Sequence, residues 1–194
     1  MMKRERQKKQ TRILLQQTAL QLFQKQGYEQ TTVLQITNEA GVAKGTFFNY
    51  FRTKEEVLQS VFSTHVERIC KRVQESEERM WHKQIEQLFY ELTTMHEKLG
   101  KEVTKSMVHI YTGKQQETLP FTPFIHMLTN IFEEGKRCGD IRTKRSSETL
   151  SLIALQLYFG ALKLWMFSHL SEPLSTFTID TITMFIDYMK KEGD

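Results

Sequence analysis

The sequence predicts an all-α protein of about nine helices. Only three prolines and nine glycines interrupt its 194 residues. Nearly every segment between them places apolar residues three and four positions apart, which is the period of an amphipathic helix. The segment 176–185 (TFTIDTITMF) could alternate as a strand, but its apolar positions continue with helical spacing to Met189. We therefore predict no strand.

Charge is distributed unevenly along the chain. Residues 1–60 hold ten lysines and arginines against five glutamates, a surplus of +5, whereas the remainder holds 17 basic and 18 acidic residues. The formal net charge of the whole chain is +4. A basic head on a neutral body indicates a polyanionic partner for the head alone.

Composition also bears on location and on cysteine chemistry. No run of about 18 apolar residues occurs, and the basic start MMKRERQKKQTR lacks the apolar stretch of a secretory signal. We therefore expect a cytoplasmic protein with no membrane partner. Cys70 and Cys138 match neither a zinc-ligand spacing nor a disulfide framework, so we expect free thiols.

The first 60 residues contain clear helix boundaries. An apolar seam of Leu15, Ala19, Leu22 and Phe23 predicts a first helix that ends at Gly27. Two capping boxes, Thr32 to Gln35 and Thr53 to Glu56, predict the start of a short second helix and of a long fourth helix through roughly residue 78. The inner face of the second helix is predicted to consist of Val33, Ile36 and Ala40.

Between these helices lies the stretch AGVAKGTFFNYF, residues 40–51. Gly41 ends the second helix and provides a tight turn, and a third short helix follows from about Lys44 to Tyr50. Two short helices joined by a glycine-containing turn, behind one packing helix and within a basic head, are typical of a helix-turn-helix unit. Five further helices follow, separated by breaks near residues 100, 112–114, 120–123, 138–140 and 171–173.

Residues 11–58 resemble the DNA-binding domain of the tetracycline-repressor (TetR) family of bacterial transcription regulators. The matching positions are Thr11-Arg12, Ala19, Leu22-Phe23, Gly27-Tyr28, Thr31-Thr32-Val33, Ile36, Ala40-Gly41-Val42, Lys44-Gly45-Thr46, Tyr50-Phe51 and Lys54-Glu55-Glu56-Val57-Leu58. The C-terminal part matches in layout only. The resemblance implies a DNA-binding domain at residues 1–53 and an effector-binding and dimerisation domain at residues 54–194.

The resemblance implies that the third helix faces duplex DNA. It implies backbone contacts from Thr32, Tyr50 and Lys54, and groove contacts from Lys44, Thr46, Phe48 and Asn49, next to Gly45 at the accessible helix start. Phe47 and Phe51, four residues apart, are then the inward anchors.

Three residues depart from the family pattern. Ala43 replaces the usual serine cap of the third helix, which we expect to cost about 1 kcal/mol of local stability. Phe48 has the ring of the usual tyrosine but no hydroxyl for a phosphate. Thr37 replaces alanine, and we expect its hydroxyl to donate to the carbonyl of Val33.

The C-terminal part is rich in aromatic and methionine side chains. Most of these side chains are explained by their packing in a helical core. The family layout implies a cavity for a small, largely apolar effector among the middle helices, with His109 and Tyr111 as polar contacts. The predicted ligand-binding residues are Phe62, Phe89, Met107, Tyr111, Phe124, Met127, Tyr158, Leu162 and Trp165.

The last two predicted helices, about residues 147–169 and 176–191, each carry two apolar stripes. A helix that is apolar on more than one side must be covered on more than one side, so we predict a homodimer with a four-helix interface. Gly160 would let another helix approach. Two heads on successive major grooves could then bind a palindromic operator.

Enzymatic function is not supported by any motif. The sequence has no nucleophile elbow, Walker loop or His-Glu-x-x-His, and we expect no cofactor or metal. His82 and Glu86 could share a metal-binding face, but an ordinary helical ion pair explains them better. We expect a DNA-binding regulator, a repressor by family frequency, that an effector releases. The alternative is a small-molecule-binding or helical interaction protein on the same scaffold without operator binding.

Overall fold

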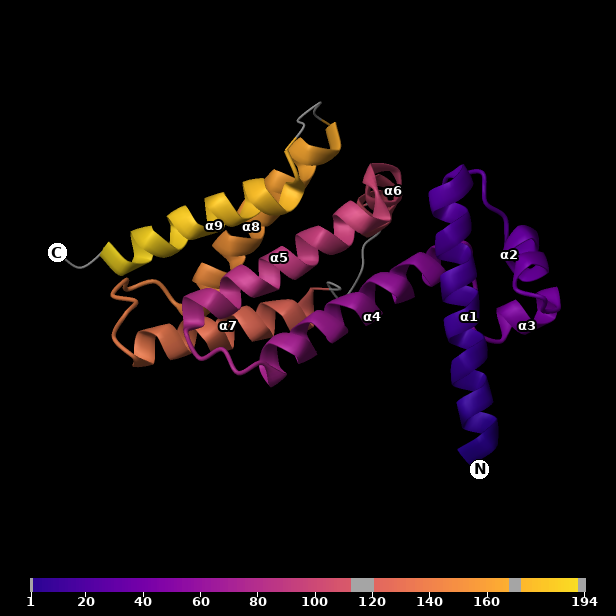
Figure 1. Ribbon diagram of the computed structural model, residues 1–194, viewed down its shortest axis with the longest axis horizontal. Helices are drawn as coiled ribbons and strands as arrows, with labels where there is room; N and C mark the ends of the chain where they lie inside the picture. Colours follow the sequence, from indigo (N-terminus) through magenta and orange to yellow (C-terminus); the bar gives the residue numbers. More distant parts are fainter. Residues whose placement is uncertain (1, 113–120, 168–171, 192–194) are drawn as a thin grey trace. The chain divides into compact units, whose positions relative to one another are not determined.

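The computed structural model describes residues 2–112, 121–167 and 172–191, and every regular element within these ranges is an α-helix (Figure 1). This confirms the predicted all-α class. The helices are α1 (Met2–Gln26), α2 (Val33–Glu39), α3 (Lys44–Phe48), α4 (Lys54–Glu75), α5 (Trp81–Leu99), α6 (Lys101–Thr112), α7 (Thr122–Arg137), α8 (Ser147–Phe167) and α9 (Leu174–Lys191).

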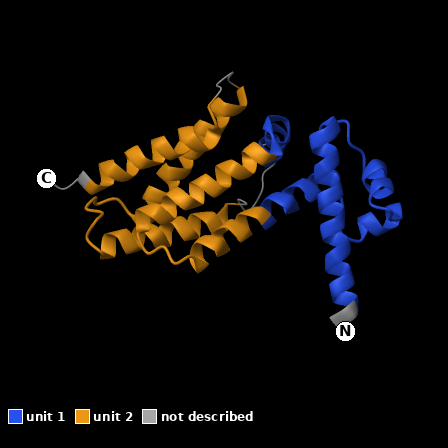
Figure 2. Ribbon diagram, in the orientation of Figure 1, with its two compact units in different colours: residues 1–64, 99–116 blue, residues 65–98, 117–194 orange. Residues whose placement is uncertain are grey.

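The chain forms two compact units, shown in different colours in Figure 2. Unit 1 consists of residues 1–64 and 99–116, and unit 2 of residues 65–98 and 117–194. Helix α4 contributes its first half to unit 1 and its second half to unit 2. Helix α6 belongs to the same unit as α1, α2 and α3.

Unit 1 is built around α1. The predicted seam is confirmed for Leu15, Ala19 and Phe23, which are fully or almost fully buried, while Leu22 is half-buried. The helix ends before Gly27, as predicted. Towards the N-terminus, α1 extends beyond Leu15, its first buried residue, as far as Met2. Most of the basic start of the chain is therefore helical.

The predicted capping box of α2 is present. The Thr32 hydroxyl accepts from the amide of Gln35 at 3.2 Å, and the Gln35 side chain accepts from the amide of Thr32 at 2.8 Å. The turn after α2 needs a left-handed residue, and Gly41 supplies it with φ of +65°. The expectation for Thr37 was wrong: its hydroxyl donates to the carbonyl of Leu34 at 3.0 Å, one residue nearer than Val33.

Two helices are shorter than predicted. Helix α3 ends at Phe48, and Asn49 is its C-cap. Helix α4 ends at Glu75. At the start of α4, the Thr53 hydroxyl accepts from the amide of Glu56, as in a capping box. The Glu56 carboxylate, however, accepts from the amide of Arg52 at 2.6 Å and not from that of Thr53. The cap residues were predictable from the sequence, but the reciprocal partner was not.

In unit 2, a glycine allows close packing at the C-terminal end of α7. A Cβ at Gly135 would lie 2.6 Å from the Ile141 side chain and 2.9 Å from the Trp81 ring. The Trp81 indole also donates to Asp140 at 2.9 Å, so α5 is tied to the segment after α7.

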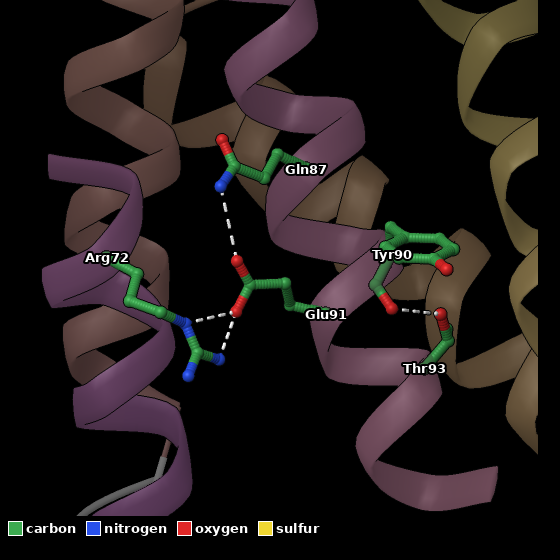
Figure 3. Close-up of polar contacts among 5 residues, drawn as sticks. All are labelled: Arg72, Gln87, Tyr90, Glu91 and Thr93. Carbon is green, nitrogen blue, oxygen red and sulfur yellow. Dashed lines mark hydrogen bonds and ion pairs between the residues drawn. The ribbon is translucent and has the colours of Figure 1, made fainter. Parts of the chain in front are cut away.

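Polar contacts join α4 to α5 within the same unit (Figure 3). The Arg72 guanidinium donates to Glu91 through Nε at 2.7 Å, and the Gln87 amide donates to the other oxygen of the same carboxylate at 3.2 Å. On the next turn of α5, the Thr93 hydroxyl donates to the Tyr90 carbonyl at 3.0 Å. Because the Arg72 side chain is more than half exposed, this ion pair should contribute little to the free energy of folding. Its main effect is to hold α4 and α5 in a defined position against each other.

Helix α8 is the most apolar helix of unit 2. By length and composition it could cross a bilayer, with a mean hydropathy of 1.5, but a core helix meets the same test. Ten of its residues are buried, and it packs against both α7 and α9. Packing on two neighbouring helices accounts for much of its apolar character.

Both cysteines are free, as predicted: Cys70 is buried and Cys138 is exposed. Burial raises the pKa of the Cys70 thiol to about 11, so this thiol stays protonated at neutral pH. Of the pair considered as metal ligands, Glu86 is engaged by Lys83, with Nζ and Oε2 2.7 Å apart.

Candidate functional site

The short helix α3 has an inner and an outer aromatic side. Phe47 is fully buried and Phe51 almost so, with ring centroids 5.8 Å apart. Phe48, between them, is 49% exposed. Consecutive residues of a helix diverge by about 100°, so seating Phe47 in the core turns Phe48 outward. The predicted inward anchors are confirmed, and the outer face of α3 stays accessible to a partner.

Most of the predicted DNA-binding residues lie together on this outer face. Lys44, Gly45, Phe48 and Asn49 are exposed. Thr46 and Tyr50 are half-buried. The helix starts without a side-chain cap, as expected for Ala43, and its first turn is closed by the amide of Thr46 donating to the Ala43 carbonyl at 2.8 Å.

Thr32 is exposed at the start of α2 and is already part of a hydrogen-bond network. Besides capping α2, its hydroxyl lies 3.1 Å from the Gln35 side-chain oxygen. Gln26, at the end of α1, donates to the same oxygen at 3.2 Å. The network fixes α2 against the end of α1, so Thr32 has a structural role whether or not it also contacts DNA.

Lys54 makes internal contacts that the sequence did not indicate. Its ammonium donates to the carbonyls of Tyr28 and Glu29 at 2.8 and 3.2 Å and lies 4.3 Å from the centroid of the Tyr28 ring. Burial, followed by the nearby charges of Glu55 and Glu29, raises the pKa of Tyr28 to about 12, so the phenol remains neutral. An ammonium has three N–H donors, so one is left for a phosphate.

We expect Lys54→Ala to weaken binding to every DNA sequence by a similar factor. If the ammonium neutralises one phosphate, its removal should flatten the slope of log affinity against log salt concentration by about 0.9 for each bound head, or about 1.8 for a dimer. Fluorescence anisotropy over a salt series measures this slope. Lys25→Ala, at an exposed lysine near the end of α1, is the control and should leave the slope unchanged. An unchanged slope for Lys54→Ala would show that the ammonium acts only inside the protein.

Arg12 connects α1 to the segment that follows α3. Its guanidinium carbon lies 4.8 Å from the centroid of the Phe51 ring, while the residue as a whole is exposed. Such stacking leaves the N–H groups at the edge of the guanidinium free to donate. Arg12 therefore adds positive charge beside the segment that follows α3.

The structure divides the nine predicted ligand-binding residues between the two units. Unit 1 contains Phe62, Met107 and Tyr111, and Figure 2 shows that α6 and the first half of α4 belong to the same unit as the head. The Tyr111 ring lies 5.6 Å from that of Phe62, and its hydroxyl donates weakly to the Gln59 carbonyl at 3.4 Å. His109, expected as a polar contact, is exposed.

The six remaining ligand-binding residues lie in unit 2. Phe89, Phe124, Tyr158, Leu162 and Trp165 are buried, and the Phe89 ring contacts those of Phe124 and Tyr158 with centroids 5.4 and 6.0 Å apart. Met127 is half-buried and lines a surface groove of about 450 Å³ among α4, α5 and α7. The groove is also lined by polar side chains, among them Gln74, His126 and Asn130.

His96, which the sequence did not single out, lies beside Tyr158 of this aromatic cluster. His96 is fully buried, and its Nε2 is 2.6 Å from the Tyr158 hydroxyl oxygen. Burial lowers the pKa of His96 to about 3 and raises the pKa of Tyr158, so both groups are neutral at physiological pH. His96 follows Phe89 by two helical turns on the same face of α5, and this spacing could have revealed it.

Comparisons with known proteins place the head in a large group of regulators. Residues 15–61 match the family model for bacterial regulatory proteins of the tetR family. Over 60 residues the chain is 50% identical to the HTH-type transcriptional regulator TcmR of Streptomyces glaucescens, a match covering 31% of this chain and 26% of TcmR. The chain thus spans about a quarter of the length of curated relatives of this kind.

Two longer matches extend beyond the head. The HTH-type transcriptional regulator YhgD of Bacillus subtilis is 23% identical over 172 residues, covering 86% of this chain and 88% of YhgD. The crystal structure of Thermus thermophilus FadR, a TetR-family transcriptional repressor in complex with lauroyl-CoA, is similar with a TM-score of 0.72. That match is 21% identical and covers 90% of this chain and 92% of the FadR chain. At this identity the likeness shows a shared fold.

Proposed function

Because the chain belongs to the TetR family of bacterial transcription regulators, we infer that it binds duplex DNA and regulates transcription as a repressor. The observation that supports this best is the exposed outer face of α3, which is seated by the buried rings of Phe47 and Phe51. The surplus of positive charge in the head is the complement that a phosphate backbone requires. We place this activity in the cytoplasm.

We propose that the DNA contacts are shared between α3 and the residues around it. Lys44, Thr46, Phe48 and Asn49 contact base edges in the major groove, with Gly45 allowing close approach. Thr32, Tyr50 and Lys54 contact the phosphate backbone. Functionally, residues 1–53 form the DNA-binding domain, and residues 54–194 bind the effector and dimerise, with Lys54 adding a DNA contact from the first residue of this second domain. The compact units are divided differently.

We propose that the outer face of α8 and α9 forms a homodimer interface. Leu152, Phe159, Leu164 and Phe167 are all at least 40% exposed and lie on the side of α8 opposite its buried residues. On α9, Met184 and Tyr188 are exposed as well. A large exposed apolar face marks an interaction site, and an isologous contact between two copies would bury it in a four-helix interface. The two heads could then bind a palindromic operator.

We propose that a small, largely apolar effector binds in the helical body and releases the DNA. The aromatic side chains around Phe89 and Phe124 supply apolar surface, and the neutral His96 and Tyr158 supply polar groups. An effector that binds better to a conformation with wrongly spaced heads would shift the population away from the DNA-bound form. Lauroyl-CoA is a reasonable first compound, since the FadR structure contains it.

Selection of bound sequences from a random duplex library tests DNA binding directly. We expect the wild-type protein to select a palindrome and Lys44→Gln to lose discrimination at one base pair in each half-site. One good contact to a base discriminates by about 1–3 kcal/mol, or roughly 5- to 150-fold. Lys25→Gln, which removes the same charge from the exposed side of α1, should keep the wild-type preference.

The outcomes separate the proposed roles. An unchanged preference for Lys44→Gln would remove Lys44 from the residues that contact bases. A wild-type protein that shows no salt-sensitive binding to any selected duplex would contradict operator binding altogether. In that case the alternative, a small-molecule-binding or helical interaction protein, would be the better description.

A further inference from the structure

The first turns of α1 lie outside the packed part of unit 1. All side chains from Arg4 to Gln10 are exposed, and the first fully buried residue of the helix is Leu15. Arg12, stacked on Phe51, marks the place where packing begins. Figure 1 shows this end of α1 extending beyond α3, the neighbouring helix of the same unit.

This extension is strongly basic and has few stabilising contacts. Residues 4–9 contain Arg4, Arg6, Lys8 and Lys9 against a single acid, Glu5. Arg4, Lys8 and Arg12 are spaced by four, which places like charges next to one another on one helix face and destabilises an isolated helix. Within the described part of the chain, none of these basic side chains forms an ion pair.

Arg4, Lys8 and Arg12 form a basic stripe that continues the buried face of α1 towards its N-terminus. Positions 4, 8, 12, 15 and 19 follow one another at spacings of three and four, so Arg4, Lys8 and Arg12 point along the same face as Leu15 and Ala19. Over the core this face is covered by the rest of unit 1. Beyond Arg12 no described part of unit 1 covers it, for a length of about 12 Å from position 12 to position 4 at 1.5 Å per residue.

The chemistry of the extension favours a polyanion over a lipid surface. A helix that lies on a membrane needs an apolar face, and residues 4–10 contain no apolar side chain. The stripe also ends at Arg12, which lies over the ring of Phe51, three residues after the proposed DNA-reading helix, so its charges start close to that helix. A length of about 12 Å can meet more than one phosphate of a duplex.

We propose that residues 4–12 of α1 form a second DNA-contacting element, which binds phosphates next to the base pairs that α3 contacts. This inference rests on the proposed DNA binding and adds a contact region to it. The element binds any sequence equally. It strengthens DNA binding and increases its salt dependence without changing base preference.

The test is a variant with Arg4→Gln, Arg6→Gln, Lys8→Gln and Lys9→Gln together. Glutamine has nearly the same helix propensity as lysine and arginine, so α1 should persist. The control carries Arg68→Gln, Lys71→Gln, Lys144→Gln and Arg145→Gln, which removes two arginines and two lysines from exposed positions outside the head. Both variants have the same net charge, and circular dichroism should show equal helix content.

We expect the head variant to bind the selected palindrome and an unrelated duplex more weakly by the same factor. The slope of log affinity against log salt should flatten by about 0.9 for each phosphate that a head no longer neutralises, while the control keeps the wild-type slope. The selected base sequence should be the same for all three proteins.

Three results would overturn the inference. Equal slope changes in the head variant and the control would indicate an effect of overall charge. An unchanged slope in the head variant would show that the extension does not touch DNA. Loss of binding to vesicles of phosphatidylserine and phosphatidylcholine in equal parts, with DNA binding unaltered, would identify a lipid partner. By contrast, a wild-type protein that binds no duplex would contradict the proposed function itself.

Discussion

Gly160→Trp should leave the protein folded but monomeric, with affinity for its selected palindrome reduced by about 100-fold or more. Gly160 lies on the exposed face of α8, and a Cβ at this position meets nothing within 4 Å, so a larger side chain fits in the single chain. In the proposed dimer the same position faces the partner helix, where an indole would hold the two helices apart. Separating two linked heads typically reduces affinity by about 10²–10⁴.

Analytical ultracentrifugation and DNA titration measure the two effects on the same sample. Asn130→Trp, which adds the same ring at an exposed position of α7, should remain dimeric and bind normally. A Gly160→Trp protein that is still a dimer would place the interface elsewhere than on this face of α8. A monomer with unreduced affinity would show that one head is sufficient for DNA binding.

Phe47→Ala should lower the free energy of unfolding of the head by about 3–5 kcal/mol. Phe47 is fully buried and contacts the rings of Phe48 and Phe51, with centroids 5.5 and 5.8 Å away. Removing its ring leaves a cavity beneath α3 and unseats the helix. DNA binding at ordinary temperature should disappear as a result.

Phe48→Ala is the matched comparison, because it removes the same atoms one residue away. Phe48 is half exposed, so its truncation should change stability by only about 0.5 kcal/mol. DNA affinity should nevertheless fall if the ring lies in the groove. Urea denaturation followed by circular dichroism separates the two variants, and equal decreases in stability would contradict the assignment of inner and outer rings.

Local rules were enough to predict much of the fold. Helical periodicity predicted the helices that the described residues form, and the threonine cap of α2 and the turn at Gly41 were each confirmed. These features depend on residues no more than five positions apart, where backbone geometry and hydrogen-bonding capacity decide the outcome. The errors concern helix ends and nearby partners, such as the carbonyl that Thr37 contacts, because several acceptors lie within reach.

Contacts between distant positions could not be predicted in this way. The pairing of His96 with Tyr158, 62 residues apart, and of Lys54 with the Tyr28 carbonyl, 26 residues apart, required the folded chain. So did the division of the predicted effector contacts between the two units.

The sequence was therefore sufficient for the helical class and the helix-turn-helix head, because periodicity and capping are local properties. The ring pair that seats α3 was predicted from the family resemblance. Only the tertiary structure showed which polar side chains form internal hydrogen bonds and which charged or apolar faces remain exposed. The physical reason is that burial depends on every element that packs against a residue, and those elements come from distant parts of the chain.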